Sequence, residues 1–558
     1  MTIHSFVRNS LLLFAFAMNF ADVCAQSSAV KKASQGVFTL TTFNADGTLH
    51  SSTKGVFVGK ADEGIAAWEP FKGARSAVVV DARGKKYDVD VMMGVSEMYN
   101  LCRFRVKGTG PIGLSFVGSD APVTKVNLIH YDIKKPSIKS VKVMKSEKFL
   151  EHLNYYLFND NEVSSTELGC PLVNDQGQLL GIMQRPVNGG QAFSADARLT
   201  NTFKITGLSI NDPTLRATDI RTALPADEKD ATLMLMVASS QVDSAKYDAY
   251  VSDFLNQFPT SAEGYNLRAS RLMNQKRMRE ADDVLQQGVK RASKKDEALS
   301  NYAKLVYQYS VYPTDSTFTA WNFSKAQELA ENAYKENPLP IYRHQVAQAI
   351  YAQGDYQKAL DIFTQLQQTD LGKNGEVYFE AAQCKTQLKK PQAEIMELIN
   401  KAVDVQPGAP SAPYLLERGR IYDQAGETRK AFEDYLRYDS IIGNRGTHQF
   451  YFLKFQNEMK LRQYQLALND IAHAIVLNRT EPTYYAEMAS LQLRVNRLED
   501  AVKTCNIALQ LTDQYSDLYI IKGISLCQLK QKEEGVKCLQ RAQQLGDPRA
   551  EGLMKKYK

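Results

Sequence analysis

The sequence predicts a multidomain β plus α protein, in which an N-terminal β-barrel domain precedes a long α-helical solenoid. The first observation is length, because 558 residues exceed what a single hydrophobic core usually holds. The second is that residues 33–208 form short runs rich in Val, Ile, Phe and Tyr, separated by turn signals. The third is that residues 228–558 change to helix-forming residues and carry an internal repeat. Residues 209–227 are predicted to be the linker.

Residues 1–25 are predicted to be a secretion signal peptide. Arg8 provides the positive charge, residues 11–20 form a short apolar core, and small residues lead to an expected cleavage after Ala25. The apolar core is too short for a permanent transmembrane helix. Acylation at Cys24 is disfavoured, because the two residues before it do not match a lipoprotein signal. The junction resembles bacterial secretory signals, so we expect a mature protein in the periplasm of a Gram-negative cell.

The turn signals of residues 33–208 favour many short strands in a closed barrel or a sandwich. Each contains Gly with Asn, Asp or Arg, which tolerate the tight backbone that a hairpin needs. They are Asn44-Ala45-Asp46-Gly47, Ala82-Arg83-Gly84, Asn174-Asp175-Gln176-Gly177 and Asn188-Gly189-Gly190. Asn211-Asp212-Pro213 and Leu224-Pro225 then mark the predicted linker, residues 209–227.

The helical part repeats a pattern of small and bulky residues in the second helix of each unit. Eight positions begin this pattern, namely Ala281, Ala326, Ala359, Ile395, Ala431, Ala467, Ala501 and Gly535. Their separations are 45, 33, 36, 36, 36, 34 and 34 residues, and the first indicates an insertion near Tyr312-Pro313-Thr314-Asp315. A period near 34 resembles the tetratricopeptide (TPR) repeat. With a degenerate unit ending at Pro259, about nine helical hairpins are expected in residues 228–558.

A series of segments in residues 53–182 has the order found in a family of enzymes. A Gly-Val-Phe-Val strand begins at Gly55, Ala-Ala-Trp-Glu begins at Ala66, and Gly-Lys-Lys-Tyr begins at Gly84. The most specific segment is Leu-Gly-Cys-Pro-Leu-Val-Asn-Asp-Gln-Gly-Gln-Leu-Leu-Gly-Ile, which begins at Leu168. These segments resemble the trypsin-like (chymotrypsin-fold) serine proteases of bacterial type. The resemblance implies a double β-barrel and covers most of the first domain.

The resemblance also implies that the catalytic positions of this family are lost here. The histidine position is Glu69, the aspartate position is Asn100 and the serine position is Leu168. Leucine has no nucleophilic atom, and a carboxylate is a much weaker base than imidazole near neutral pH. The glycine whose N–H helps to form the oxyanion hole corresponds to Thr166. We therefore predict a pseudoprotease that is not an enzyme.

An active hydrolase with a non-standard site remains an alternative. Ser164 and Ser165 are nearby hydroxyls, but using either would break the register of the Gly-Cys-Pro-Leu match. No histidine occurs between His50 and His130, so a small shift of alignment does not restore the base. Cys170 could be imagined as a thiol nucleophile, although a buried or disulfide-bonded cysteine is the simpler interpretation.

Two surfaces are expected to bind partners. The barrel cleft near Trp68, Glu69 and Leu168 either holds a peptide or has become a docking surface; alternatively the domain is only a structural cap. TPR arrays expose the first helix of each hairpin on a concave side, which is mixed in charge here. The candidate groove residues are Gln348, Tyr351, Arg420, Asp423, Gln456, Lys460 and Arg494.

Charge, composition and cysteine spacing argue against several other classes of function. A net charge of +6 without a dense Lys/Arg stripe gives no reason to expect nucleic acid. No CxxC motif or Cys/His cluster occurs, so we expect no metal and no cofactor, while a Cys102–Cys170 disulfide is compatible with an oxidising compartment. Cys505, Cys527 and Cys538 are expected to be small buried side chains.

The leading functional hypothesis is a non-catalytic adaptor or scaffold that binds proteins or peptides of the cell envelope. The alternative that is also not an enzyme is a holdase, which would bind peptides or unfolded client proteins. No transmembrane segment is expected, although peripheral association with the outer membrane is compatible with the sequence. The sequence leaves the partner and the oligomeric state open.

Overall fold

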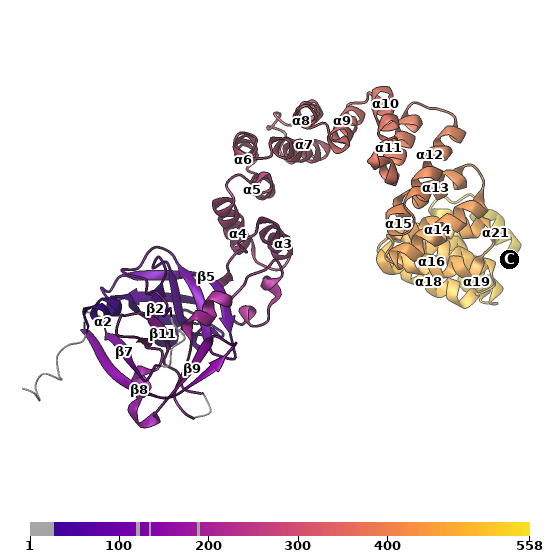
Figure 1. Ribbon diagram of the computed structural model, residues 1–558. Helices are drawn as coiled ribbons and strands as arrows, with labels where there is room; N and C mark the ends of the chain where they lie inside the picture. The colour runs from indigo at the N-terminus through magenta and orange to yellow at the C-terminus, as the bar shows by residue number, and fades with distance from the viewer. Residues whose placement is uncertain (1–26, 119–122, 133–134, 187–189, 558) are drawn as a thin grey trace, which may run out of the picture. The chain divides into compact units, whose positions relative to one another are not determined.

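A computed structural model describes residues 27–118, 123–132, 135–186 and 190–557, so the predicted signal peptide lies outside the described residues. The chain divides into two compact units, Met1–Lys294 and Lys295–Lys558, and each is described by itself (Figure 1). The first unit contains the short helix α2 (Ser28–Ala33), two β-sheets and four α-helices that follow them, and the described part of the second contains helices without strands. The predicted fold class is confirmed, because two barrel-like sheets precede a series of helical hairpins.

The first sheet closes on itself. Its strand order is β13-β5-β4-β1-β2-β3-β6, and β5 also pairs with β6. The six strands of this barrel are antiparallel, whereas β13 joins β5 in parallel. The strands are β1 (Val37–Phe43), β2 (Leu49–Val58), β3 (Glu63–Ala67), β4 (Ser76–Asp81), β5 (Lys86–Ser96), β6 (Leu101–Val106) and β13 (Arg221–Thr222). Closure removes the unpaired edges that an open sheet would expose.

The second sheet has the order β11-β10-β7-β8-β9-β12, and bridges between Gly181 and Asp196 and between Gln184 and Phe193 bring its two ends together. Its strands are β7 (Lys125–Asp132), β8 (Lys135–Phe149), β9 (Leu153–Phe158), β10 (Pro171–Val173), β11 (Leu179–Ile182) and β12 (Phe193–Ala195). The turn predicted at residues 174–177 joins β10 to β11, and its Asn174 side chain accepts hydrogen bonds from the N–H groups of Gln176 and Gln178.

Three apolar cores hold these sheets together. One fills the first barrel and includes Phe38, Trp68 and Phe104. A second fills the other barrel around Leu172 and Tyr156. The third lies between the barrels and combines residues of both sheets, namely Val37, Val56, Ile65, Leu101, Ile129, Leu153, Val173, Leu179 and Ile182. The two barrels are therefore packed as one body by alternating inward-facing residues.

The segment predicted as a linker packs onto the first barrel. Two short 3₁₀ turns, Ser209–Asn211 and Leu215–Ala217, precede β13, and Ile210, Leu215 and Ile220 are buried. The Arg221 guanidinium then bonds Asp90 on β5 at 3.1 Å and Asp253 on helix α4 (Ser244–Gln257) at 2.6 Å. These contacts tie the first helices to the barrel within this unit.

The helices pair consecutively into antiparallel hairpins. In the first unit they are α3 (Glu228–Ala238), α4, α5 (Ala262–Asn274) and α6 (Met278–Arg291). In the second they are α7 (Lys295–Val311), α8 (Phe323–Glu336), α9 (Pro340–Ala352), α10 (Tyr356–Leu366), α11 (Gly375–Gln387), α12 (Gln392–Val405), α13 (Ala412–Gln424), α14 (Thr428–Ile442), α15 (His448–Lys460), α16 (Tyr464–Leu477), α17 (Pro482–Arg494), α18 (Leu498–Leu511), α19 (Ser516–Gln528), α20 (Lys532–Gln544) and α21 (Arg549–Tyr557). None of the described helices is long and apolar enough to span a bilayer.

The predicted register of the repeat is confirmed. Each of the eight anchor residues lies near the start of the second helix of a hairpin, and all eight are buried. Small side chains there let neighbouring helices approach closely. At Gly419 on α13 a Cβ atom would lie 2.6 Å from the buried Tyr435 ring of α14, so this helix pair requires glycine. The insertion occupies residues 312–322 between α7 and α8, where Trp321 packs edge-on against Tyr309.

Candidate functional site

Glu69 and Asn100, two of the three positions matched to the protease triad, are in direct contact. The Glu69 backbone N–H donates to Asn100 Oδ1 at 2.8 Å, and the Trp68 N–H donates to the Asn100 carbonyl at 3.2 Å. Asn100 has φ +48°, a left-handed conformation that asparagine adopts more readily than most residues. The amide of Asn100 therefore holds the short 3₁₀ turn Glu69–Phe71 against the start of β6.

Glu69 itself points to solvent and is used in ion pairs. Its carboxylate lies 3.0 Å from the Lys72 ammonium, which also bonds Glu97 at 2.9 Å. These two carboxylates raise the pKa of Lys72. A carboxylate at this position, already paired with an ammonium, provides no imidazole to accept a proton from a nucleophile.

The loop before Leu168 is closed into a turn. Residues Ser165–Glu167 form a 3₁₀ helix with a capping box, in which the Ser164 N–H donates to Glu167 Oε2 at 2.7 Å. The N–H of Leu168 donates to the Ser165 carbonyl at 3.4 Å. In trypsin-like enzymes the N–H at the serine position faces the oxyanion. Here it faces its own turn, and the Leu168 side chain packs against the core of the second barrel.

Of the alternative nucleophiles, Ser164 is hydrogen-bonded to a hydroxyl, Cys170 is buried and Ser165 is exposed. The Ser164 hydroxyl hydrogen-bonds the Thr166 hydroxyl at 2.9 Å rather than an imidazole. Cys170 is completely buried in the second-barrel core, where no substrate reaches its sulfur. Trp68, expected at the cleft, is also completely buried, in the first-barrel core, so its side chain contributes no surface for a partner.

The disulfide considered from the sequence is not formed. Cys102 and Cys170 each remain a thiol, because they belong to the cores of different barrels. The Cys102 Sγ donates to the Ala66 carbonyl at 3.5 Å, and burial raises the pKa of this thiol. Cys505 is buried as expected, whereas Cys527 and Cys538 are only half-buried.

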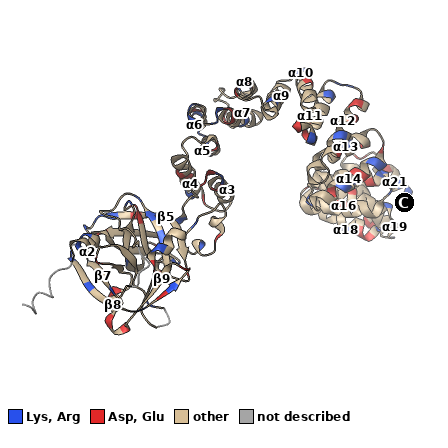
Figure 2. Cartoon of the chain, in the orientation of Figure 1, with Lys and Arg blue, Asp and Glu red and all other residues tan. Residues whose placement is uncertain are grey.

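The predicted groove residues lie on the first helices of their hairpins in the second unit. Gln348 and Tyr351 are half-buried on α9, Arg420 and Asp423 lie on α13, Gln456 and Lys460 on α15, and Arg494 on α17. The structure joins Asp423 to Lys460, whose ammonium lies 2.8 Å from the carboxylate. Arg420, Gln456 and Arg494 remain exposed. Lys/Arg and Asp/Glu residues are interspersed among the helices of the second unit (Figure 2).

Two cavities were not expected from the sequence. One of about 850 Å³ lies between the first barrel and helices α3 and α4. Its charged lining includes Asp90, Asp227, Asp230, Asp253, Arg105 and Lys204. These residues come from two separate stretches of the chain, residues 90–105 and 203–257, so no local sequence signal could group them.

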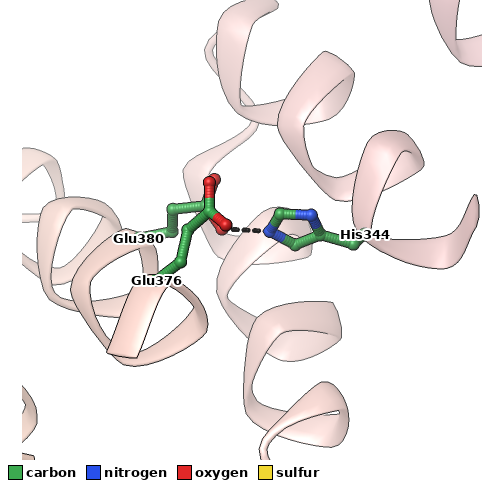
Figure 3. A group of neighbouring side chains, drawn as sticks. All are labelled: His344, Glu376 and Glu380. Atoms are coloured by element: carbon green, nitrogen blue, oxygen red, sulfur yellow. Dashed lines mark hydrogen bonds and ion pairs between the residues drawn. The ribbon is translucent and has the colours of Figure 1, made fainter. Parts of the chain in front are cut away.

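The second cavity, of about 420 Å³, lies among α7, α8, α9 and α11. His344 and Glu376 contribute to its lining, and Glu380 lies beside them. Figure 3 shows both glutamates reaching from α11 toward the imidazole of His344 on α9. Burial would lower the pKa of His344, but hydrogen bonding to Glu380 outweighs it and raises that pKa.

Comparisons with known proteins give structural likenesses only. No protein-family model matches the sequence, and no curated protein matches it. Among solved structures, YrrB, a TPR protein with an unusual peptide-binding site, is 15% identical, with a TM-score of 0.31 over 35% of this chain and 97% of that chain. The Rv3671c protease from M. tuberculosis, in its active form, is 14% identical, with a TM-score of 0.28 over 36% of this chain and 86% of that chain. The serine endoprotease from Yersinia pestis is 14% identical, with a TM-score of 0.28 over 35% and 67%. The fold assignment rests on the strand order and helix pairing of this chain rather than on these likenesses.

Proposed function

We propose that this chain is a non-catalytic adaptor of the bacterial cell envelope, which holds proteins or peptides on its helical hairpins. The observation that carries the proposal is the state of the triad-matched positions. Asn100 is used to hold the Glu69 turn, Glu69 is paired with Lys72, and Leu168 packs against an apolar core. Acyl transfer needs a nucleophile, a base and an oriented oxyanion site, and these three positions supply none of them.

The binding surface that we propose is the exposed face of the first helices. Arg420, Gln456 and Arg494 present both donors and acceptors to solvent, and Asp423 is fixed by Lys460. An extended polypeptide offers backbone N–H and C=O groups at regular spacing, which such a mixed polar face can match. The protease-like domain then serves as a docking platform or a cap of the array.

The proposal makes a direct biochemical prediction about hydrolysis. Purified protein should not react with a fluorophosphonate serine probe and should not cleave casein or a peptide library. Leu168→Ala should leave this lack of hydrolysis unchanged, because the leucine side chain packs against an apolar core and has no nucleophilic atom. If peptide turnover is measured and a single substitution in the barrel abolishes it, the chain is a hydrolase and the adaptor proposal is wrong.

Cross-linking in cells tests the binding surface. A photo-reactive residue is placed at Gln456 on α15, and a matched control at Glu433 on α14, which is also exposed. A discrete adduct from position 456 and none from position 433 would support the adaptor. A heterogeneous set of unfolded clients would favour the holdase instead. Fractionation of the same cells tests export to the periplasm.

A further inference from the structure

Three side chains from two consecutive hairpins converge in the second unit. Glu376 and Glu380 are four residues apart on α11 and therefore share one face of the helix, and His344 faces them from α9. One ligand atom of each residue lies within 4.8 Å of the other two. His344 is 5% exposed, Glu380 is half-buried and Glu376 is exposed.

A hydrogen bond from a residue outside the group helps to orient the Glu380 carboxylate. The Gln348 side-chain amide donates to Glu380 Oε1 at 2.8 Å, while Glu380 Oε2 contacts His344 Nε2. Glu380 is thus fixed from two sides, in the way that neighbouring hydrogen bonds orient metal ligands. Partial burial of the Glu376 carboxyl, and then the neighbouring Glu380 carboxylate, raises the pKa of Glu376. Part of the Glu376 residue nevertheless remains exposed to solvent.

The charge of the group is unbalanced. Two carboxylates face one imidazole, so even a protonated His344 leaves one negative charge without a partner inside the group. Lys304, the lysine that lines the adjoining cavity, is exposed to water. A divalent cation between the three side chains would balance both carboxylates and leave the imidazole neutral, which is the form that binds metals.

We propose that His344, Glu376 and Glu380 form a binding site for one divalent transition-metal ion, with zinc as the best-matched ion. An imidazole nitrogen together with carboxylate oxygens suits zinc and its neighbours, whereas calcium and magnesium prefer oxygen ligands alone. Zinc ligands lie about 2.0–2.2 Å from the ion. The three atoms are already close enough that side-chain rotations of the two glutamates would bring them to this distance.

The site has an open side. Three protein ligands leave a fourth tetrahedral position, which a water molecule or an outside ligand would occupy. His344 and Glu376 line the 420 Å³ cavity, whose other polar residues include Gln345, Asn301 and Ser300. The fourth position therefore has room for a carboxylate or imidazole of a bound molecule. This inference does not depend on the adaptor function.

Without an ion, the same residues form a simpler arrangement, in which protonated His344 pairs with Glu380. Zinc binding would replace their direct hydrogen bond by two bonds to the ion. The number of zinc ions bound per chain and the spectrum of bound cobalt distinguish the two arrangements. The thermal stability of the protein alone does not.

The test uses the full chain without a histidine tag, stripped with a chelator and then titrated with zinc against a chromophoric competitor. The variants are His344→Gln, Glu376→Gln and Glu380→Gln. Glu397→Gln on α12 is the matched control, because it removes one carboxylate that is exposed and forms an ion pair with Lys401. We expect each of the three variants to bind this zinc ion at least about 10-fold more weakly than the wild type and the control.

Cobalt distinguishes this site from the cysteines. Bound Co²⁺ should give visible ligand-field bands without a thiolate charge-transfer band, and the bands should disappear in Glu376→Gln. Zinc should raise the thermal midpoint of the wild type and of Glu397→Gln but not of the three variants. Equal zinc affinity in all proteins, or a thiolate band for bound cobalt, would overturn the proposal. Glu376→Gln keeps the test decisive if His344→Gln does not fold, because Glu376 is exposed.

Discussion

The backbone N–H of Glu69 donates a hydrogen bond to the side-chain oxygen of Asn100 across 2.8 Å. In the family that this domain resembles, these positions hold a base and the carboxylate that orients it. Here the side-chain oxygen of Asn100 instead accepts a hydrogen bond from the main-chain N–H of Glu69. This bond holds the turn that begins at Glu69. The described contact between these two residues is therefore one that holds a backbone turn.

Substitutions of Asn100 should separate two contributions to stability, namely the hydrogen bond that its side chain accepts and the left-handed backbone that it tolerates. Asn100→Ala removes the acceptor for the Glu69 N–H and places alanine at φ +48°, so we expect a loss of about 1–3 kcal/mol in the stability of the first unit. Asn100→Gly removes the acceptor but tolerates the backbone, and should cost less. Asn100→Asp keeps the acceptor and should cost least. Thermal midpoints of the three variants check this order; equal midpoints would contradict it.

Arg221 should be required for the junction between the barrel and the first helices. Its side chain is only 13% exposed and bonds Asp90 and Asp253, so Arg221→Met would leave two partly buried carboxylates without a partner. We expect a loss of about 1–3 kcal/mol and faster proteolysis within residues 222–262. Arg75→Met is the control, because its ion pair with Asp219 is half-exposed and should contribute little. Similar proteolysis of both variants would show that the junction does not depend on Arg221.

Gly419→Ala should destabilise the second unit. The added methyl group would lie 2.6 Å from the ring of Tyr435, which is fully buried. Overpacking of this kind costs about 1–3 kcal/mol. Gly552→Ala on α21 is the control, because nothing lies within 4 Å of its Cβ position, and alanine there should be neutral or stabilising. Differential scanning calorimetry of both variants measures the contrast.

Glu458 should make the second unit less stable as the pH rises. The carboxyl group is completely buried on α15; this burial, and then the neighbouring Asp470, raises its pKa to about 9. Because the folded pKa is above the ordinary value of 4.5, the contribution of this group to stability is fully present below pH 4.5. It decreases as the pH rises toward 9, by at most about 1.4 kcal/mol per pH unit.

Glu458→Gln removes this titration while keeping the shape of the side chain. The difference in thermal midpoint between the variant and the wild type should therefore grow in favour of the variant from pH 5 to pH 9. Lys454, which bonds Asp439 at 2.8 Å and Asp470 at 3.1 Å, is unchanged in this comparison. A difference that stays constant over this pH range would mean that Glu458 does not titrate there.

Cys102 and Cys170 should both be thiols in the folded protein. Alkylation in denaturant without a reducing agent should modify both, as read by peptide mass spectrometry, because the two sulfurs lie in separate cores. Under native conditions they should react much more slowly than the half-buried Cys527 and Cys538. Recovery of a Cys102–Cys170 cross-linked peptide would contradict this description of the barrels.

The sequence predicted the parts of the fold that depend on local periodicity. In a helical repeat the same position of each unit is buried. The spacing between these positions was therefore enough to align the eight anchor residues from Ala281 to Gly535. Short strands and Asn-, Asp- or Gly-containing turns likewise indicated a closed barrel or a sandwich, and the resemblance to trypsin-like proteases implied the double barrel. The positions matched to the triad also came from the order of segments, and in the structure Glu69 follows β3 and Asn100 follows β5.

Tertiary packing alone decided which side chains meet. Trp68 looked like a cleft residue, yet the first barrel closes around it, and Cys102 and Cys170 lie in different cores although both are in one domain. His344 is 32 residues before Glu376 and 36 before Glu380, and no metal-binding spacing joins them in the sequence. Their meeting depends on how α9 packs beside α11, which is set by contacts along whole helices rather than by the residues next to each ligand.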